Sequence, residues 1–239
     1  MSRPDILLYT AATMNGWKPL IFLEEAAVEY ELYHVSFSKR EQKSDWYLKL
    51  NPNGRIPTIV DRSEDDFVVF ESGAILWYLA HKYQRFLPQS QKQRSEVLQW
   101  VMFQMAGIGP MLGQAMYFQR IAEPHGHRDE FATKRYVKES RRLLEVLDTR
   151  LAQSEYLVGD DFSIADITTY PWARSYYWAK VSVEGLEHLQ RWLELIDERP
   201  ATQKALALPE PNRAFFGEGD VEAGQAANAA RFSKDINSQ

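Results

Sequence analysis

The 239-residue sequence contains no cysteine. Disulfide frameworks, zinc sites built on thiolates, cysteine nucleophiles and Cys-x-x-Cys redox chemistry are therefore excluded for this chain. Any thiol that takes part in its chemistry must arrive on another molecule.

Long apolar runs and an excess of positive charge are also missing. No run approaches the 18 or so apolar residues of a membrane helix, and the segment that begins at Met1 has neither the apolar core nor the cleavage site of a secretory signal. Lys and Arg number 28 against 33 Asp and Glu, a net charge of −5, so no summed positive field attracts nucleic acid or anionic lipid. We therefore expect a cytoplasmic protein with no nucleic-acid or membrane partner.

The remaining composition is that of a folded protein. Hydrophobic residues make up 45% of the chain and charged residues 26%, which is enough apolar surface for a sizeable core. The length of 239 residues allows one large domain or two unequal smaller ones, and does not choose between them.

The first third of the chain alternates short apolar runs with helical spacing. Period-two and short apolar patterns predict strands at 6–9, 31–37, 55–60 and 67–70, and 3.6-residue spacing predicts helices at 16–29 and 71–83. The order βαβ followed by ββα predicts an α/β domain over residues 1–84, and a proline at the start of the third strand is typical of a thioredoxin-like arrangement.

The rest of the chain predicts helices only. After a linker at 85–88, residues 89–119 favour one long helix that the Gly-Ile-Gly-Pro of 107–110 bends or interrupts, and 131–153 favours another. Ser163 with Asp166 three residues later is a helix-start signature. We expect an all-helical domain over 91–208, followed by a polar tail at 209–239 that is irregular or partly disordered.

Three short segments carry candidate chemistry, and the first is Ile56-Pro57. A cis bond before Pro57 turns the backbone N–H and C=O of Ile56 toward a peptide-like ligand instead of into the sheet. The alternative is a proline that only starts an edge strand. The dipeptide alone leaves the two equally open.

The second segment is Glu71-Ser72-Gly73, where the fourth predicted strand meets a helix. Free N–H groups and the Ser72 hydroxyl suit a carboxylate, while the Glu71 carboxylate suits an ammonium. A ligand with both charges on one carbon fits this pair. The alternative is an ordinary helix cap at Ser72, which is the commoner role of such a serine.

The third segment, Thr10 to Gly16, joins the first strand to the first helix. The Thr13 hydroxyl and the Asn15 amide are both able to donate to a sulfur over the helix N-terminus, where the helix dipole favours a thiolate. Lowering a thiol pKa by about 2 units takes roughly 2.7 kcal/mol, which a few aimed hydrogen bonds and a helix end supply. The alternative is capping, with Asn15 as the cap.

These segments occur together in sequences that the chain resembles over about residues 5 to 208. The motifs are Leu8–Gly16, Asn51–Asp61, Phe70–Leu76, Gly109–Gln114 and Ser163–Ile167. The family is that of the glutathione transferases, and within it the bacterial Nu class and the fungal group related to the yeast nitrogen-catabolite regulator. Two positions depart from these relatives: Met14 replaces the usual proline, and Ala115 replaces a polar residue.

The resemblance implies a homodimer with a thioredoxin-like domain, a helical domain, glutathione as co-substrate and no metal. It implies a glutathione transferase that acts on a small electrophile or disulfide, with glutathione-dependent disulfide-bond reductase activity. The implied glutathione contacts are Thr13 and Asn15 at the sulfur, Gln42 and Arg55 at the glycine end, Ile56 beside Pro57 at the cysteinyl unit, Glu71 and Ser72 at the γ-glutamyl end, and Arg135 reaching into the partner subunit's site.

Two other functions remain open at this stage. One is a glutathione-binding carrier or regulator with little turnover, and the other is an enzyme that conjugates or isomerises a single metabolite. An electrophile site between the domains has these candidate lining residues: Trp17, Met111, Met116, Phe118, Trp172, Tyr176 and Tyr177. The five histidines show no metal-ligand spacing with carboxylates.

Overall fold

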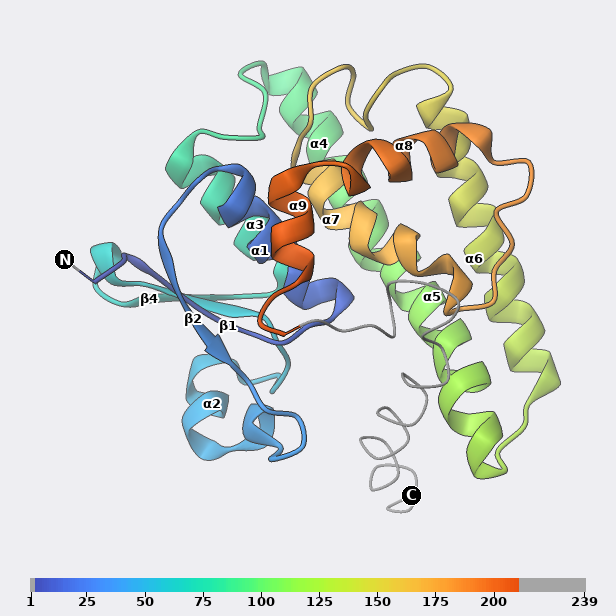
Figure 1. The fold of residues 1–239 in the computed structure, drawn as a ribbon, viewed down its shortest axis with the longest axis horizontal. Helices are drawn as coiled ribbons and strands as arrows, with labels where there is room; N and C mark the ends of the chain where they lie inside the picture. The colour runs from blue at the N-terminus through green and yellow to red at the C-terminus, as the bar shows by residue number, and fades with distance from the viewer. Residues whose placement is uncertain (1–2, 211–239) are drawn as a thin grey trace.

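The computed structural model describes residues 3–210 and begins with a four-stranded mixed sheet. The strands are β1 (Ile6–Thr10), β2 (Tyr30–His34), β3 (Thr58–Asp61) and β4 (Phe67–Phe70), in the order β2-β1-β3-β4. β1 is parallel to β2 and antiparallel to β3, and β3 is antiparallel to β4. Figure 1 shows α1 (Met14–Glu25) and α3 (Ser72–Tyr83) between this sheet and the helical part of the molecule. The predicted thioredoxin-like arrangement is confirmed.

One helix of this domain was absent from the sequence prediction. α2 (Asp45–Leu50) has six residues, too few for a helical period to stand out, and of these only Tyr47 is buried. The Tyr47 hydroxyl donates to the Arg55 carbonyl at 2.8 Å, as does the side-chain amide of Asn51. These bonds hold the chain in a loop, so the third strand starts at Thr58 and not at residue 55.

Helices make up the second part of the described chain. They are α4 (Gln91–Phe103), α5 (Gly109–Met116), α6 (Glu130–Leu151), α7 (Ile164–Ala173), α8 (Glu187–Asp197) and α9 (Pro200–Leu206). The predicted long helix is present as α4, a π-helical segment at Gln104–Ile108 and α5 in direct succession. Gly109 keeps helical backbone angles there, and a Cβ on it would lie 2.8 Å from the side-chain nitrogen Nε2 of Gln104.

α7 lies at the centre of the helical domain. It begins with the predicted capping box: the Ser163 hydroxyl accepts from the backbone of the first turn, and the Asp166 carboxylate accepts from the Ser163 N–H at 3.0 Å. The other oxygen of Asp166 accepts from Leu157 N–H and from the Trp192 indole. Asp166 thus ties the start of α7 to a loop and to α8.

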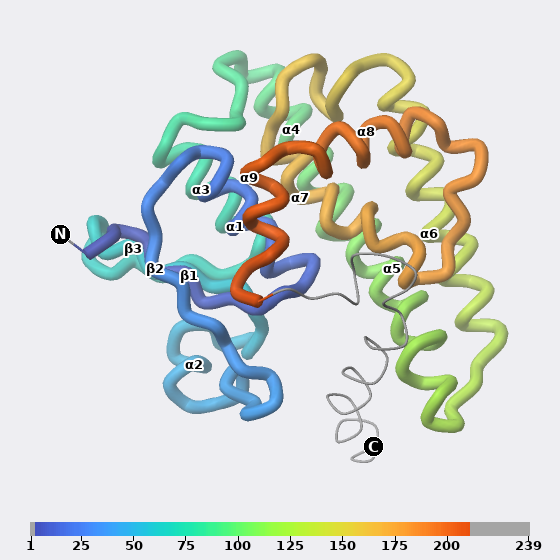
Figure 2. Tube along the Cα trace, in the orientation of Figure 1, coloured from blue at the N-terminus to red at the C-terminus, as the bar shows by residue number. Residues whose placement is uncertain are grey.

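Contacts of α1 with α7 and α9 join the two parts of the molecule. Figure 2 shows α9 running alongside α1. Glu25 of α1 pairs with Arg199 at 2.6 Å, and Glu24 pairs with Lys204 at 2.7 Å. The tail predicted at 209–239 falls, beyond residue 210, outside the described residues. Within 3–210 no helix is both long and apolar enough to cross a membrane.

Candidate active site

The sheet register brings the three candidate segments to one end of the sheet. Tyr9 near the end of β1 pairs with Thr58 at the start of β3, and Thr58 pairs with Phe70 at the end of β4. The loop after β1, the Ile56-Pro57 dipeptide and the β4–α3 junction therefore meet at this end.

Thr13, not Asn15, is the N-cap of α1. Its hydroxyl oxygen accepts from Gly16 N–H at 3.1 Å, and the O–H of the same group still has its proton to donate. Gly16 is required by space, because a Cβ on it would lie 2.0 Å from the Ala11 carbonyl oxygen. Met14, the departure from the usual proline, is buried as the first residue of α1.

Asn15 is the second residue of α1, and its side chain has a fixed orientation. Its Oδ1 accepts from the Trp172 indole N–H at 2.8 Å. The acceptor end of the amide is therefore occupied, and the two N–H donors of Nδ2 remain for a ligand. Trp172, which the sequence suggested as an electrophile contact, thus touches this catalytic candidate.

The peptide bond between Ile56 and Pro57 is cis, which decides between the two readings of the dipeptide. β3 begins one residue after Pro57. In the described part of the chain, neither the N–H nor the C=O of Ile56 forms a hydrogen bond within the protein, while the neighbouring Arg55 carbonyl accepts two. The Ile56 backbone therefore keeps both groups for an external partner.

Ser72 is the first residue of α3, and Glu71 occupies the cap position without a side-chain capping bond. The Glu71 backbone has φ +69° and ψ 117°, in the left-handed range that non-glycine residues rarely adopt. Its side chain is exposed, whereas Ser72 is buried. An ordinary cap at Ser72 is thus not what the structure contains.

Lys18 is a site residue that the sequence analysis missed. It is fully buried, and its Nζ donates to Ser72 Oγ at 3.1 Å, to Gln104 Oε1 at 2.6 Å and to Met105 Sδ at 3.4 Å. Burial lowers the pKa of Lys18 to about 7, and the Glu71 carboxylate opposes this shift. The signal was a lone charge inside the apolar run from Trp17 to Leu23.

The remaining predicted residues lie farther out. Gln42 sits in a 3-10 turn at Glu41–Lys43, and its buried Oε1 has no hydrogen-bond partner among the described residues. The Arg55 side chain is exposed nearby. It lies on the same loop as Gly54, which packs closely against the Gln42 backbone. Arg135 is exposed on α6, which Figure 1 draws on the far side of the helical domain from the sheet. One subunit does not bring Arg135 to the other residues.

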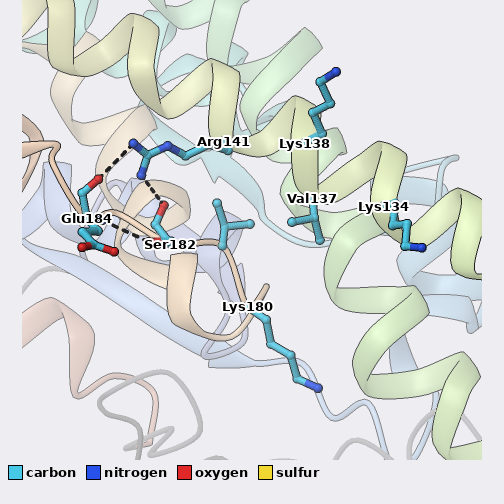
Figure 3. A pocket seen from close by; sticks show the side chains of 8 residues that line it. Lys134, Val137, Lys138, Arg141, Lys180, Ser182 and Glu184 are labelled. Atoms are coloured by element: carbon cyan, nitrogen blue, oxygen red, sulfur yellow. Dashed lines mark hydrogen bonds between the residues drawn. The ribbon is translucent and has the colours of Figure 1, made fainter.

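An open pocket of about 600 Å³ lies away from this site, between α6 and residues 180–184. Figure 3 shows Arg141 donating to the backbone carbonyls of Ser182 and Glu184, at 2.7 and 3.0 Å. Lys134, Lys138 and Lys180 surround the pocket with charges exposed to solvent. Across residues 3–210 no group of three or more His, Asp or Glu side chains is placed to hold a metal ion.

Comparison with known proteins decides the family. The N-terminal domain model of glutathione S-transferases matches residues 4–81, and the C-terminal domain model matches residues 103–200. The Escherichia coli K12 protein named disulfide-bond oxidoreductase YfcG is 41% identical over 203 residues, which are 83% of this chain and 93% of that protein. The chain belongs to the glutathione transferase family.

Solved structures similar to this glutathione transferase contain glutathione. A glutathione transferase from Burkholderia graminis, with two glutathione molecules per subunit, has a TM-score of 0.82 and 40% identity over 87% of this chain and 90% of that one. The glutathione transferase URE2P6 from Phanerochaete chrysosporium, in complex with oxidised glutathione, has a TM-score of 0.78 and 36% identity over 84% of this chain and 94% of that one. The resemblance to the bacterial and Ure2-related fungal members is confirmed.

Proposed function

We propose that this glutathione transferase holds glutathione at the described end of the sheet and uses its thiolate to reduce disulfides. The observation that carries the proposal is the orientation of Asn15, whose amide donors are left free when Trp172 occupies the amide oxygen. The names of the similar proteins, a disulfide-bond oxidoreductase and a complex with oxidised glutathione, support the same reaction.

The thiolate is stabilised by groups at the start of α1. Asn15 Nδ2 and the Thr13 hydroxyl donate to the sulfur, and the N-terminal end of the helix adds its partial positive charge. Hydrogen bonds to a charged acceptor contribute about 1.5 to 3 kcal/mol each, so these groups suffice to lower the thiol pKa by about 2 units.

The peptide part of glutathione is bound by the neighbouring segments. The free N–H and C=O of Ile56, beside Pro57, pair with the cysteinyl unit. Ser72 receives the γ-glutamyl carboxylate and Glu71 the ammonium. Gln42 and Arg55 contact the glycine end, where the unpartnered Gln42 Oε1 accepts from the glycine N–H.

The reaction needs two glutathione molecules because the chain has no thiol of its own. The first thiolate attacks one sulfur of a disulfide, a new S–S bond forms, the old one breaks, and the leaving thiolate takes up a proton. A second glutathione thiolate attacks the mixed disulfide at its glutathionyl sulfur. Glutathione disulfide and a second free thiol result, and two electrons have passed to the substrate.

The enzyme acts as a cytoplasmic homodimer in which Arg135 reaches the partner's site. Phe131 is 79% exposed and stands one turn from Arg135 on α6, so the two share a face of the helix. Phe67 on β4 and Met102 on α4 are also more than half exposed. Burial of such side chains in a partner surface favours association.

Asn15→Ala tests the assignment of the thiolate site. We expect glutathione-dependent reduction of a small disulfide to fall by more than about tenfold at saturating glutathione, because a donor to the reacting sulfur is lost. Gln203→Ala, which removes an exposed amide on α9, is the matched control and leaves the rate unchanged. A loss smaller than tenfold in Asn15→Ala contradicts the assignment.

Binding and turnover measurements on the wild-type chain distinguish an enzyme from a carrier. Retention on immobilised glutathione together with turnover of disulfides supports the proposal. Retention without turnover of any disulfide or electrophile overturns it in favour of a glutathione-binding regulator. Crystals soaked in oxidised glutathione are expected to hold two glutathionyl units side by side.

A further inference from the structure

Lys18 is fully buried, and in its charged form all three of its N–H donors have acceptors. Its three donors meet Ser72 Oγ, Gln104 Oε1 and Met105 Sδ, and none of the three acceptors is charged. A fully buried ammonium without a contacting anion is costly, so this position favours a lysine that is able to lose its proton.

The Ser72 hydroxyl lies between Lys18 and the proposed γ-glutamyl site. Ser72 Oγ accepts from Lys18 Nζ and donates its own proton to Met105 Sδ at 3.7 Å, a weak acceptor that leaves this proton able to turn to a stronger one. A ligand carboxylate at the N-terminus of α3 is placed to accept it. The carboxylate is then one hydroxyl away from Nζ, close enough for a charged Lys18 to attract it across a poorly solvated path.

We propose that Lys18 is a positioning residue that anchors the γ-glutamyl carboxylate through Ser72, and that glutathione binding is coupled to protonation of the Lys18 amine. This inference rests on the proposed function, because it adds a proton to the same binding site. The ligand brings the negative charge that the buried site lacks, so the charged form of Lys18 becomes the favoured one.

The charges around Lys18 support this coupling. Burial sets the pKa of Lys18 at about 7 in the free protein, so the amine is largely neutral at pH 8, and Glu71 is the carboxylate that acts on it. On α1 and the helices packed against it, the other Asp, Glu, Lys, Arg and His side chains have partners of their own: Glu24 with Lys204, Glu25 with Arg199, Lys82 with Asp61, His81 with the Trp77 carbonyl, and Asp166 in its capping box. Glu24 lies about 9 Å farther along α1 than Lys18.

The ligand amine partly offsets the effect of the ligand carboxylate. If Glu71 receives the ammonium, the attraction of Glu71 for a charged Lys18 is weakened. The carboxylate nevertheless dominates, because it contacts the hydroxyl that Lys18 itself contacts. The sign of the coupling is therefore proton uptake on binding, over a window that begins near pH 7 and extends upward.

The test is calorimetric titration with S-methylglutathione at pH 8, in buffers of different ionisation enthalpy. S-methylglutathione has no thiol, so no proton is released by thiolate formation. On binding, we expect the wild-type protein to take up about half a proton per site, or more, in excess of what Lys18→Met takes up. At pH 7 we expect the wild type to bind the ligand about tenfold more tightly than Lys18→Met does. The ligand amine titrates alike in both proteins and cancels in the comparison.

Gln104→Glu is the second variant and is independent of whether Lys18→Met folds. It places a carboxylate 2.6 Å from Nζ without touching the ligand site, and so keeps Lys18 charged in the free protein. We expect affinity within about threefold of wild type but no extra proton uptake. If Lys18 has only a structural role, proton uptake is the same in the wild type and both variants. That result overturns the inference. Failure of the wild type to bind the ligand instead overturns the proposed function.

Discussion

Single side chains in this site act through partners that lie elsewhere in the chain. Asn15 presents its amide donors to the proposed ligand because Trp172 of α7 takes its oxygen, and Ser72 donates only to the weak acceptor Met105 Sδ because Lys18 supplies the other hydrogen bond. In both pairs the residue that we propose to contact glutathione is small and polar. Its partner is a larger side chain anchored in the core, which fixes the orientation.

Trp172→Phe isolates the orienting bond, because it keeps the ring and removes the indole donor. The Asn15 amide then loses its fixed orientation, and we expect kcat to fall about three- to tenfold with KM for glutathione changed less than about twofold. The pKa of bound glutathione thiol, followed by ultraviolet absorbance of the thiolate, rises by about half a unit or more. Trp77→Phe, on α3, is the control, and equal kcat in both variants would refute the role of Trp172.

The start points of α1 and α7 depend on the capping contacts at their N-terminal ends. α1 starts with the Thr13 cap and a glycine that admits the Ala11 carbonyl, and α7 starts with a capping box whose carboxylate also holds two distant groups. The two helices pack against each other, so their start points determine where Asn15 and Trp172 meet. The capping of these two helices thus controls the geometry of the site.

Asp166→Ala tests the capping box of α7. It leaves buried N–H groups of Leu157, Ser163 and Trp192 without their acceptor, and we expect the free energy of unfolding to fall by about 3 kcal/mol or more. Urea unfolding monitors the change as a lower midpoint at similar slope. Asp160→Ala removes an exposed carboxylate near the same loop and is expected to stay within about 0.5 kcal/mol of wild type.

At the scale of the whole molecule, the interface between the domains and the exposed face of α6 have different roles. Lys18, bridging Ser72 and Gln104, and the Glu25–Arg199 pair join the sheet domain to the helices within one chain. The α6 face that bears Phe131 and Arg135 is left open in the single subunit. An Arg135 contribution to catalysis therefore requires a second subunit.

Phe131→Glu tests that second subunit. We expect the wild type to sediment with the mass of two chains, and the variant to associate at least about tenfold more weakly, because a buried aromatic ring contributes about 1.5 to 3 kcal/mol. Gln203→Glu introduces the same charge at an exposed position on α9 and leaves the mass unchanged. A monomeric wild type at micromolar concentration would remove the basis for a role of Arg135.

Local sequence patterns determined most of the fold. Strand alternation, the helix periods and the Ser163–Asp166 signature predicted β1, β4, α3, α6 and the start of α7, since each depends on neighbours within a few residues. α2 was not predicted, because its six residues span fewer than two helical turns. The sequence predicted a thioredoxin-like arrangement, and the strand order and register that bring Thr13, Ile56 and Ser72 to one end of the sheet came from the structure.

Only the tertiary structure decided how the site residues are oriented. The Asn15–Trp172 bond joins positions 157 apart, and the Lys18 bonds to Ser72 and Gln104 join positions 54 and 86 apart. Such distances carry no local periodicity, because these contacts arise from the packing of α1 against α3 and α7. The sequence by itself determined which polar groups reach the end of the sheet, and the packing of the two domains determined which of their hydrogen-bonding groups remain for a ligand.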